Sequence, residues 1–337
     1  MTDPVVLAEL WRGDFLESRH FGHAVIVDDT GQIVDAWGDP DKLIYPRSSA
    51  KMLQALPLLE SGAAREARLT SEHLALACAS HIGAASHTRR VVDWLTDLGL
   101  AEADLRCGAQ VPSDRTARHG LRAAGDSPSQ IHNNCSGKHS GFLTLSRHLK
   151  AGSEYIDVDH PVQRQIRASF EEMAGEVSPG FGIDGCSAPN FTCTLLGFAR
   201  ALARMAAPEA LGPTRKAAVE ALVGAMIAHP DLVAGEGKAC TALMRAAPGV
   251  ALKTGAEGVY AAILPRQRKA IALKVEDGAT RASEAAIAAL LVRLGVLEAD
   301  DPVALAYTRA EVRNRRHVLT GHVRAAPYLL SPSPGSS

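Results

Sequence analysis

The sequence lacks an excess of either charge, an apolar stretch long enough to span a bilayer, and an export signal. Its 36 Lys and Arg residues nearly balance 37 Asp and Glu residues, so no large field would attract nucleic acid or anionic lipid. A membrane-spanning helix needs roughly 20 apolar residues, whereas the Ala-rich stretch 285–294 is shorter and contains Arg293. The N-terminus has no basic start followed by an apolar run. We expect a cytoplasmic protein whose partner is a small neutral or zwitterionic molecule, not nucleic acid or membrane.

The six cysteines lack the spacing of a disulfide framework or of a common zinc motif. They are scattered along 337 residues with no Cys-x-x-Cys pair, so we expect reduced thiols. Cys135 and Cys186 lie in two separate polar loops. With a His or Lys nitrogen and a water they are a candidate tetrahedral zinc site. The alternative, favoured by spacing alone, is a pair of buried thiols without metal.

Alternating, strand-like segments near both ends of the chain enclose a long helical middle. Strands are predicted at 5–11, 24–27, 33–37, 250–254, 259–264, 270–275 and 317–323, and a helix at 282–294. This order predicts an α+β fold in which an antiparallel sheet is built from both chain ends with an inserted helical lobe. The sheet lobe takes in about residues 1–68 and 248–330, and the helical lobe about 69–247. Residues 331–337 are predicted to be a disordered tail.

Ser48 and Lys51 form the sharpest local motif. They follow Pro46, where apolar residues at 52, 53, 56 and 59 adopt a helical period. Residues three apart share one face of a helix, so the Lys51 amine is expected beside the Ser48 hydroxyl. Burial favours an uncharged amine, which can take the proton of a serine nucleophile. By itself Ser-x-x-Lys also occurs by chance, and a serine at a helix start is often only an N-cap.

A second motif, Lys253-Thr254-Gly255, lies on a predicted strand far downstream. Ser-x-x-Lys followed by Lys-Thr-Gly is the pairing found in serine β-lactamases and penicillin-binding proteins. Their sheet with an inserted helical lobe is the architecture predicted above, so we expect a serine β-lactamase-like fold. No Ser-Asp-Asn or close variant lies between the two motifs. Because one of the three sequence motifs of those enzymes is missing, a β-lactamase or peptidase activity is less well supported than the fold.

Three further clusters are dense in reactive side chains. One is the stretch 132–139, HNNCSGKH, directly before a predicted helix, and another is the Gly-rich stretch 182–190. The third is Cys78-Ala79-Ser80-His81 at the end of a helical pattern. Ser80 is a candidate second catalytic hydroxyl, although a serine at a helix C-terminus more often bonds back to its own chain.

Together these motifs resemble the rhizobial-type L-asparaginases over about residues 9–321. The resemblance implies a homodimer that hydrolyses L-asparagine to L-aspartate and ammonia. It also implies two Ser–Lys pairs and a zinc ion with an unusual lysine ligand. By motif the pairs fall on Ser48 with Lys51 and Ser80 with Lys253, and the zinc ligands on Cys135, Lys138 and Cys186.

The predicted mechanism is a Ser48 acyl-enzyme with Lys51 as general base, assisted by Ser80 and Lys253. An amino-acid substrate also needs a cation for its α-carboxylate and an anion for its α-ammonium. Candidates for substrate binding are Arg47, Asp184, His139 and Asn133. We expect zinc to be structural or to orient the substrate, because a serine already supplies the nucleophile.

Two alternatives remain open. A serine-dependent glutaminase on the same fold is one, because an extra substrate methylene changes binding by only about 1–3 kcal/mol. A non-catalytic protein that binds zinc or an amino acid is the other.

Overall fold

The computed structural model describes residues 2–331, which form two compact units. Of the described residues, the sheet unit comprises 2–49, 193–207 and 242–331, and the helical unit Ala50–Thr192 and Pro208–Thr241. Of the predicted tail, residues 332–337 lie outside the described residues. Within residues 2–331, no helix combines the length and the apolar character needed to cross a bilayer.

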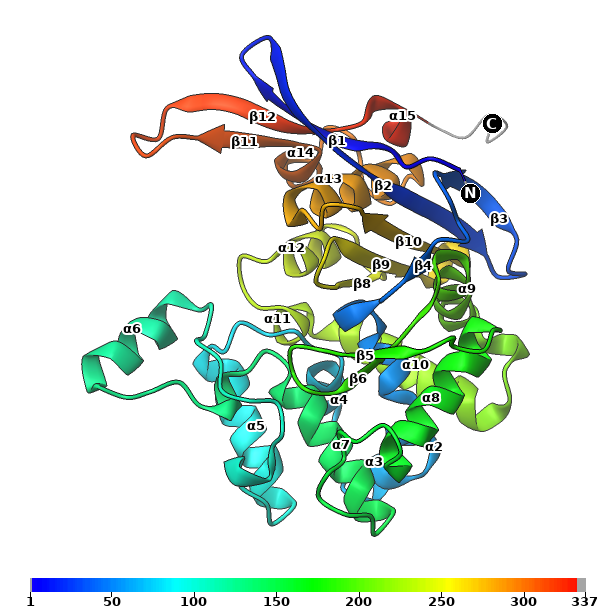
Figure 1. The fold of residues 1–337 in the computed structure, drawn as a ribbon, viewed down its shortest axis with the longest axis vertical. Coiled ribbons are helices and arrows are strands. Elements are labelled where there is room, and N and C mark those ends of the chain that lie inside the picture. The colour runs from blue at the N-terminus through cyan, green and yellow to red at the C-terminus, as the bar shows by residue number, and fades with distance from the viewer. Residues whose placement is uncertain (1, 332–337) are drawn as a thin grey trace. The chain divides into compact units, whose positions relative to one another are not determined.

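An eight-stranded antiparallel sheet forms the centre of the sheet unit (Figure 1). Its order is β11-β12-β1-β2-β10-β9-β8, and β3 also pairs with β2. The strands are β1 (Val5–Arg12), β2 (Phe15–Asp28), β3 (Ile33–Trp37), β8 (Ala251–Thr254), β9 (Val259–Leu264), β10 (Lys269–Val275), β11 (Arg309–Arg313) and β12 (Leu319–Ala325). Early and late strands pair directly, with Leu10 opposite Val323 and Ile26 opposite Ile271. The predicted α+β class, with a sheet built from both chain ends, is confirmed.

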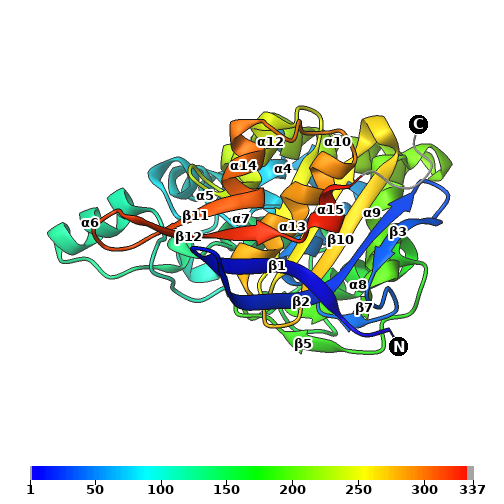
Figure 2. The same ribbon diagram turned by 90° about the horizontal axis from the view of Figure 1, so that it is seen from above.

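Helices bury the middle of this sheet. All six residues of β9 are buried, although successive side chains point to opposite faces. Both α9 (Leu195–Ala206) and α13 (Thr280–Arg293) pack on β9 and β10. Figure 2 shows α13 and α14 (Pro302–Thr308) beside the strands, with α15 (Pro327–Leu330) close by. Continuous apolar strands covered by Ala-rich helices thus make the core of this unit.

The helical unit is built around α7 (Ser136–His148), whose first eleven residues are all buried. It contacts α2, α3, α4, α5 and α8. The helices of the unit are α1 (Lys51–Gln54), α2 (Leu56–Glu60), α3 (Ala63–Glu66), α4 (Ser71–Ala77), α5 (Ala85–Asp97), α6 (Arg115–Ala124), α8 (Pro161–Ala174), α10 (Pro213–Ala228) and α11 (Pro230–Val233), and α12 (Ala239–Ala246) contains the last crossing between the units. A small hairpin pairs β5 (Phe181–Ile183) with β6 (Pro189–Phe191).

The segment after Pro46 differs from the single helix predicted for it. A 3₁₀ turn at Arg47–Ala50 leads into the short α1, and α2 then begins at Leu56. Pro57 explains the break, since proline has no N–H to continue the hydrogen-bond pattern. The division of the chain also differs: α1 to α3 belong to the helical unit and α9 to the sheet unit.

Candidate active site

The turn that carries Ser48 lies against the Lys-Thr-Gly segment within the sheet unit. β4 (Leu43–Ile44) pairs with β7 (Cys193–Thr194), and Pro46 follows shortly after β4. Ser49 then bonds back to the Pro46 carbonyl oxygen through both its N–H, at 3.2 Å, and its hydroxyl. A Cβ added to Gly255 would lie 2.8 Å from that oxygen and 3.2 Å from Ser49 N. The two sequence motifs are therefore packed together, with glycine required at the contact.

Ser48 itself is half-buried, whereas the neighbouring Ser49 is fully buried. Arg47, directly before it, has a φ of 54°, in the left-handed region that non-glycine residues rarely adopt. Lys253 is buried on β8, and its Nζ donates to the Thr254 carbonyl at 2.7 Å. The sheet unit thus supplies a partly accessible hydroxyl and, from the second motif, a buried amine.

The Lys51 amine is the centre of a second group, in the helical unit. It is 1% exposed, and its Nζ contacts the Ala79 carbonyl oxygen, Ser80 Oγ at 3.0 Å and Cys135 Sγ at 3.1 Å. Ser80 is partly exposed. The sequence paired Ser80 with Lys253, which stays a prediction; within the helical unit the Ser80 hydroxyl contacts Lys51.

The segment after α4 holds Ser80 in place through its neighbour His81. The backbone N–H groups of Ser80 and His81 donate to the carbonyls of Val233 and Asn134 at 2.9 and 3.1 Å. Gly83 N–H donates to His81 Nδ1 at 3.1 Å, so the ring hydrogen lies on Nε2, which is 2.9 Å from Ser136 Oγ. Burial lowers the pKa of His81 well below its ordinary value. A neutral imidazole thus links the Ser80 segment to the start of α7.

Cys135, Lys138 and Cys186 meet beside Lys51. Cys135 is the N-cap residue of α7, and Lys138 follows in the first turn of the helix. Cys186 lies in the loop between β5 and β6, where Asp184 N–H donates to the Ala188 carbonyl at 3.0 Å. Lys138 Nζ is 3.0 Å from Cys186 Sγ. All three side chains are buried.

The two thiols shift each other's pKa in opposite directions. A hydrogen bond from Cys135 lowers the pKa of Cys186 well below its ordinary value, helped by the charges of Lys138 and Lys51. The same bond, with burial, raises the pKa of Cys135 to about 12. For Lys138, burial lowers the pKa, but the Cys186 and Cys135 sulfurs outweigh burial and raise it overall. These directions favour ionisation of Cys186 and retention of the protons on Lys138 and Cys135.

The side chains expected to bind zinc lie close together, and their chemistry can be compared with the needs of that ion. In the part of the chain that the structure describes, no group of three or more His, Cys, Asp or Glu side chains could hold a metal ion. Two sulfurs in hydrogen-bond contact and one amine are nevertheless present. Zinc bound to sulfur at about 2.3 Å and nitrogen at about 2.0 Å keeps these ligands roughly 3.5 Å apart, against 3.0 Å for Lys138 and Cys186. The set fits zinc after an opening of about half an ångström and loss of the ammonium proton.

The remaining predicted residues surround this cluster or the Ser48 turn. Asn133 donates from Nδ2 to the carbonyls of Cys107 and Gly108, at 2.9 and 3.0 Å, and accepts from Cys135 N–H at 2.9 Å. Asp184 is partly exposed in the β5–β6 loop, and its charge acts on Lys138. Asn133 thus ties the Cys107–Gly108 backbone to the Cys135 backbone, through its amide hydrogens on one side and its amide oxygen on the other.

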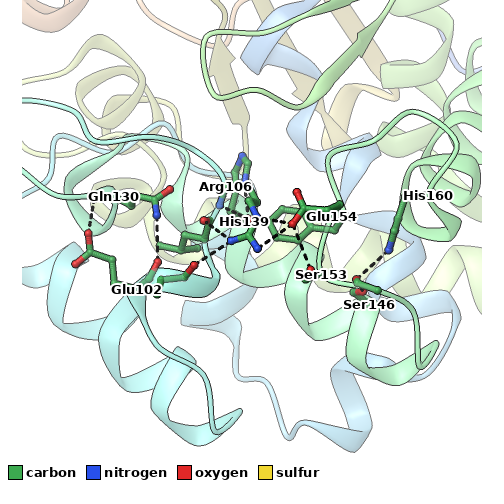
Figure 3. Close-up of polar contacts among 12 residues, drawn as sticks. Glu102, Arg106, Gln130, His139, Ser146, Ser153, Glu154 and His160 are labelled. Carbon is green, nitrogen blue, oxygen red and sulfur yellow. Dashed lines mark hydrogen bonds and ion pairs between the residues drawn. The ribbon is translucent and has the colours of Figure 1, made fainter.

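One residue that the sequence did not single out is Tyr155. Its buried hydroxyl lies 2.9 Å from His139 Nδ1 and accepts from the Arg106 backbone N–H at 2.7 Å. Figure 3 shows His139 beside Arg106 and Glu154, which form an ion pair. Tyr155 follows His139 by 16 residues in an irregular segment, so no periodicity marks it.

Several solved structures are similar to this chain at low sequence identity. They include the protein Mglu in its native form (13% identity, TM-score 0.47, covering 87% of this chain and 69% of that one), Mglu in its glutamate form (15%, 0.45, 83% and 62%) and a β-lactamase from Mycobacterium bovis (13%, 0.39, 80% and 93%). TM-scores below 0.5 support no further conclusion, and the α+β class stands on the sheet topology.

No curated protein matches the chain. The family profile for L-asparaginase II does match it, over residues 8–325. That range contains every residue placed in the site above, from Arg47 to Lys253. With nearly its whole length matched, the chain belongs to the L-asparaginase II family.

Proposed function

We propose that this protein is an L-asparaginase of the rhizobial type that releases ammonia through an ester on Ser48. Membership of the L-asparaginase II family supports asparaginase-type amide hydrolysis. The observation that carries the mechanism is the buried Lys51 amine, which lies 3.0 Å from Ser80 Oγ and three residues after Ser48. Amines excluded from water beside hydroxyl groups are suited to proton transfer.

In the first half-reaction, Ser48 Oγ attacks the side-chain amide carbon of asparagine. Lys51 takes the serine proton, and the proton passes to the amide nitrogen, which leaves as ammonia. A β-aspartyl ester on Ser48 remains. In the second half-reaction water attacks this ester, its proton follows the same groups, and aspartate leaves with Ser48 restored.

Lys51 has contacts that suit a proton carrier. An uncharged amine has two hydrogens and one lone pair, and Lys51 has three polar neighbours. The Ala79 carbonyl can only accept a hydrogen bond, and Cys135 Sγ can accept the second. The lone pair is then left for a hydroxyl, which Ser80 supplies within the helical unit. Ser80 is therefore our candidate for carrying the proton toward the leaving ammonia, together with Lys253.

Substrate recognition needs one cation and one anion. Arg47, adjacent to Ser48, is the candidate for the α-carboxylate, and Asp184 for the α-ammonium. Asn133 would act through Cys135, whose backbone N–H it holds at 2.9 Å. His139 is a candidate for direct substrate contact.

Zinc at Cys135, Lys138 and Cys186 is part of the proposal. Bound there, the ion would neutralise the thiolates and could polarise a nearby substrate oxygen. The residues themselves hold the first turn of α7 to the β5–β6 loop, because Lys138 and Cys186 are in contact. The chain's own serine and lysines supply the nucleophile and the proton transfer.

The experiment that tests this function is ammonia release from L-asparagine by the purified protein and by Ser48→Ala. We expect the substitution to lower kcat by at least about 10³-fold. Ser49→Ala is the matched control, since Ser49 is buried and its hydroxyl bonds only to the Pro46 carbonyl in this turn. Wild-type activity in Ser48→Ala, or equal losses in both variants with unchanged folding, would contradict the role of Ser48.

The same assay separates the alternatives. Turnover of L-glutamine at a higher kcat/KM than L-asparagine would identify a glutaminase. Asparagine or zinc binding without turnover of either amide would identify a binding protein. Light scattering of the purified protein tests the homodimer that the family resemblance implies.

A further inference from the structure

A buried hydrogen-bond chain runs from the backbone of Arg106 through Tyr155 to His139. Arg106 N–H donates to the Tyr155 hydroxyl oxygen at 2.7 Å, and that oxygen is 2.9 Å from His139 Nδ1. Both side chains are 0% exposed. Next to these hydrogen bonds, the side chains of Arg106 and Glu154 form an ion pair at 2.9 Å (Figure 3). The ion pair joins the segment before Tyr155 to the segment that contains Arg106. The hydroxyl is thus held from two sides.

These hydrogen bonds determine which ring nitrogen of His139 carries the hydrogen. Among residues 2–331, the Tyr155 hydroxyl has only Arg106 N and His139 Nδ1 as hydrogen-bond partners. Arg106 N–H is necessarily a donor, so the single hydroxyl hydrogen is left for Nδ1. A neutral imidazole that accepts at Nδ1 carries its hydrogen on Nε2. His139 is therefore held as an Nε2–H donor.

That donor has no acceptor in the protein. His139 Nε2 is buried, and it has no hydrogen-bond partner in the described residues. Buried N–H groups in proteins are nearly always paired, because an unmade bond costs the full desolvation of the group. A donor that is both oriented and unpaired indicates that its acceptor comes from a bound molecule.

The surroundings of His139 are those of the candidate active site. Its backbone N–H bonds to the Cys135 carbonyl at 3.0 Å in the first turn of α7. The titratable groups that act electrostatically on its ring are Lys138, Cys135, Lys51 and Asp184. Each of these has a role in the function proposed above, so the substrate of that function is our candidate for the molecule that supplies the acceptor.

Building on the proposed function, we propose that His139 donates its Nε2–H to an oxygen of the amino-acid amide, and that Tyr155 is a positioning residue that holds His139 in this tautomer. Without the hydroxyl, Nδ1 loses its fixed donor, and the ring is free to carry its hydrogen on either nitrogen. The fraction of protein ready to bind the substrate oxygen then falls.

Four single substitutions test this pair of roles. Tyr155→Phe removes only the hydroxyl, and Tyr328→Phe is its matched control, since the Tyr328 hydroxyl bonds to the Val6 carbonyl in the sheet unit. His139→Gln places an amide nitrogen near the position of Nε2, whereas His139→Asn places one near Nδ1. The two histidine variants therefore differ in whether a donor is kept where the substrate would need it.

Binding of L-asparagine is measured by calorimetry in proteins that also carry Ser48→Ala. We expect Tyr155→Phe and His139→Asn each to weaken binding about tenfold, with His139→Gln within about threefold and Tyr328→Phe unchanged. The double variant Tyr155→Phe/His139→Gln should bind as His139→Gln does, because no tautomer remains to be set. A purely structural role for Tyr155 predicts the opposite, an added loss in the double variant.

The tautomer is measured independently by ¹⁵N NMR of the histidine rings. The His139 signal, assigned by its disappearance in His139→Gln, should show hydrogen on Nε2 in wild type and a mixture in Tyr155→Phe. If wild type releases no ammonia from asparagine, the proposed function fails while the tautomer result stands. If wild type is active but Tyr155→Phe binds asparagine equally well, or if both His139 variants lose binding equally, the roles of Tyr155 and His139 are wrong.

Discussion

The Nζ of Lys51 lies 3.1 Å from Sγ of Cys135. The residue proposed as general base therefore touches a residue proposed as a zinc ligand. Lys51 contacts Ser80 at 3.0 Å as well. A change in the charge of the sulfur, by oxidation or by metal binding, would act directly on the group proposed to take the serine proton. The metal cluster and the base are best studied together.

Lys51→Arg should abolish turnover while preserving the fold. A guanidinium stays charged at all accessible pH values and cannot accept a proton, so we expect kcat to fall by at least about 10³-fold. Lys216→Arg, at an exposed lysine on α10, is the control. The measurement is ammonia release combined with circular dichroism. Retention of even a tenth of wild-type kcat in Lys51→Arg would remove Lys51 from the mechanism.

Gly255→Ala should impair the enzyme through the turn that carries Ser48. Its Cβ would meet the Pro46 carbonyl oxygen at 2.8 Å, so the turn or the strand has to shift. We expect the free energy of unfolding to fall by about 1–3 kcal/mol. We also expect kcat to fall by a larger factor than the fraction of folded protein does. Gly224→Ala on α10, where an added Cβ meets nothing within 4 Å, should leave both values near wild type. Normal turnover in Gly255→Ala would mean that the turn tolerates displacement.

Removal of zinc tests the Cys135, Lys138 and Cys186 cluster. Metal analysis of purified wild-type protein should find zinc, and Cys135→Ser, Lys138→Gln and Cys186→Ser should each lose most of it. Cys240→Ser, a buried cysteine outside the cluster, should keep it. Chelation should weaken asparagine binding and leave measurable turnover, because in the proposed mechanism Ser48 supplies the nucleophile. A chelated protein that stays folded and binds asparagine, yet has no turnover at all, would contradict an orienting role for the metal.

Stability should fall on the acid side of pH 6.5. Burial holds the pKa of His81 well below its ordinary value of 6.5, so below that pH the unfolded chain binds a proton that the folded chain refuses. The free energy of unfolding then decreases by up to about 1.4 kcal/mol per pH unit for such a histidine. Urea unfolding at pH 7.5, 6.5 and 5.5 measures this slope, and His81→Gln should reduce it. The same slope in His81→Gln and wild type would show that other groups control acid stability.

Sequence pattern predicted the sheet well where strands alternate cleanly. The turn between β2 and β3 and the later strands β8 to β10 fall at the expected places, because apolar alternation and turn residues specify both faces of a strand. β2 begins at Phe15, well before the predicted start at residue 24. β11 was missed, since its five residues, RAEVR, are mostly charged or small and are half-exposed at the sheet edge. The helix predicted after Pro46 was too long, because the helical spacing of the apolar residues continues across Pro57, where the observed helix is interrupted.

The sequence indicated which residues belong to the candidate site, but it did not indicate which of their side chains contact one another. Lys51, Ser80 and Cys135 come from three stretches singled out in the sequence, and the helical unit brings them together. Their mutual contacts depend on how α1, α4 and α7 pack, which local pattern does not encode. Tyr155 was missed for the same reason, because its partners lie on other segments and only the folded chain gives it a role.

The pairing of β1 between β2 and β12 has a consequence for biosynthesis. β1 and β2 leave the ribosome first, yet β1 cannot gain its second neighbour until residues 319–325 have been made. During most of synthesis the first hairpin therefore has an open edge of unpaired N–H and C=O groups, which other chains can join. A stalled or shortened chain lacking β12 should aggregate with β1 exposed, whereas release of the finished chain closes the sheet.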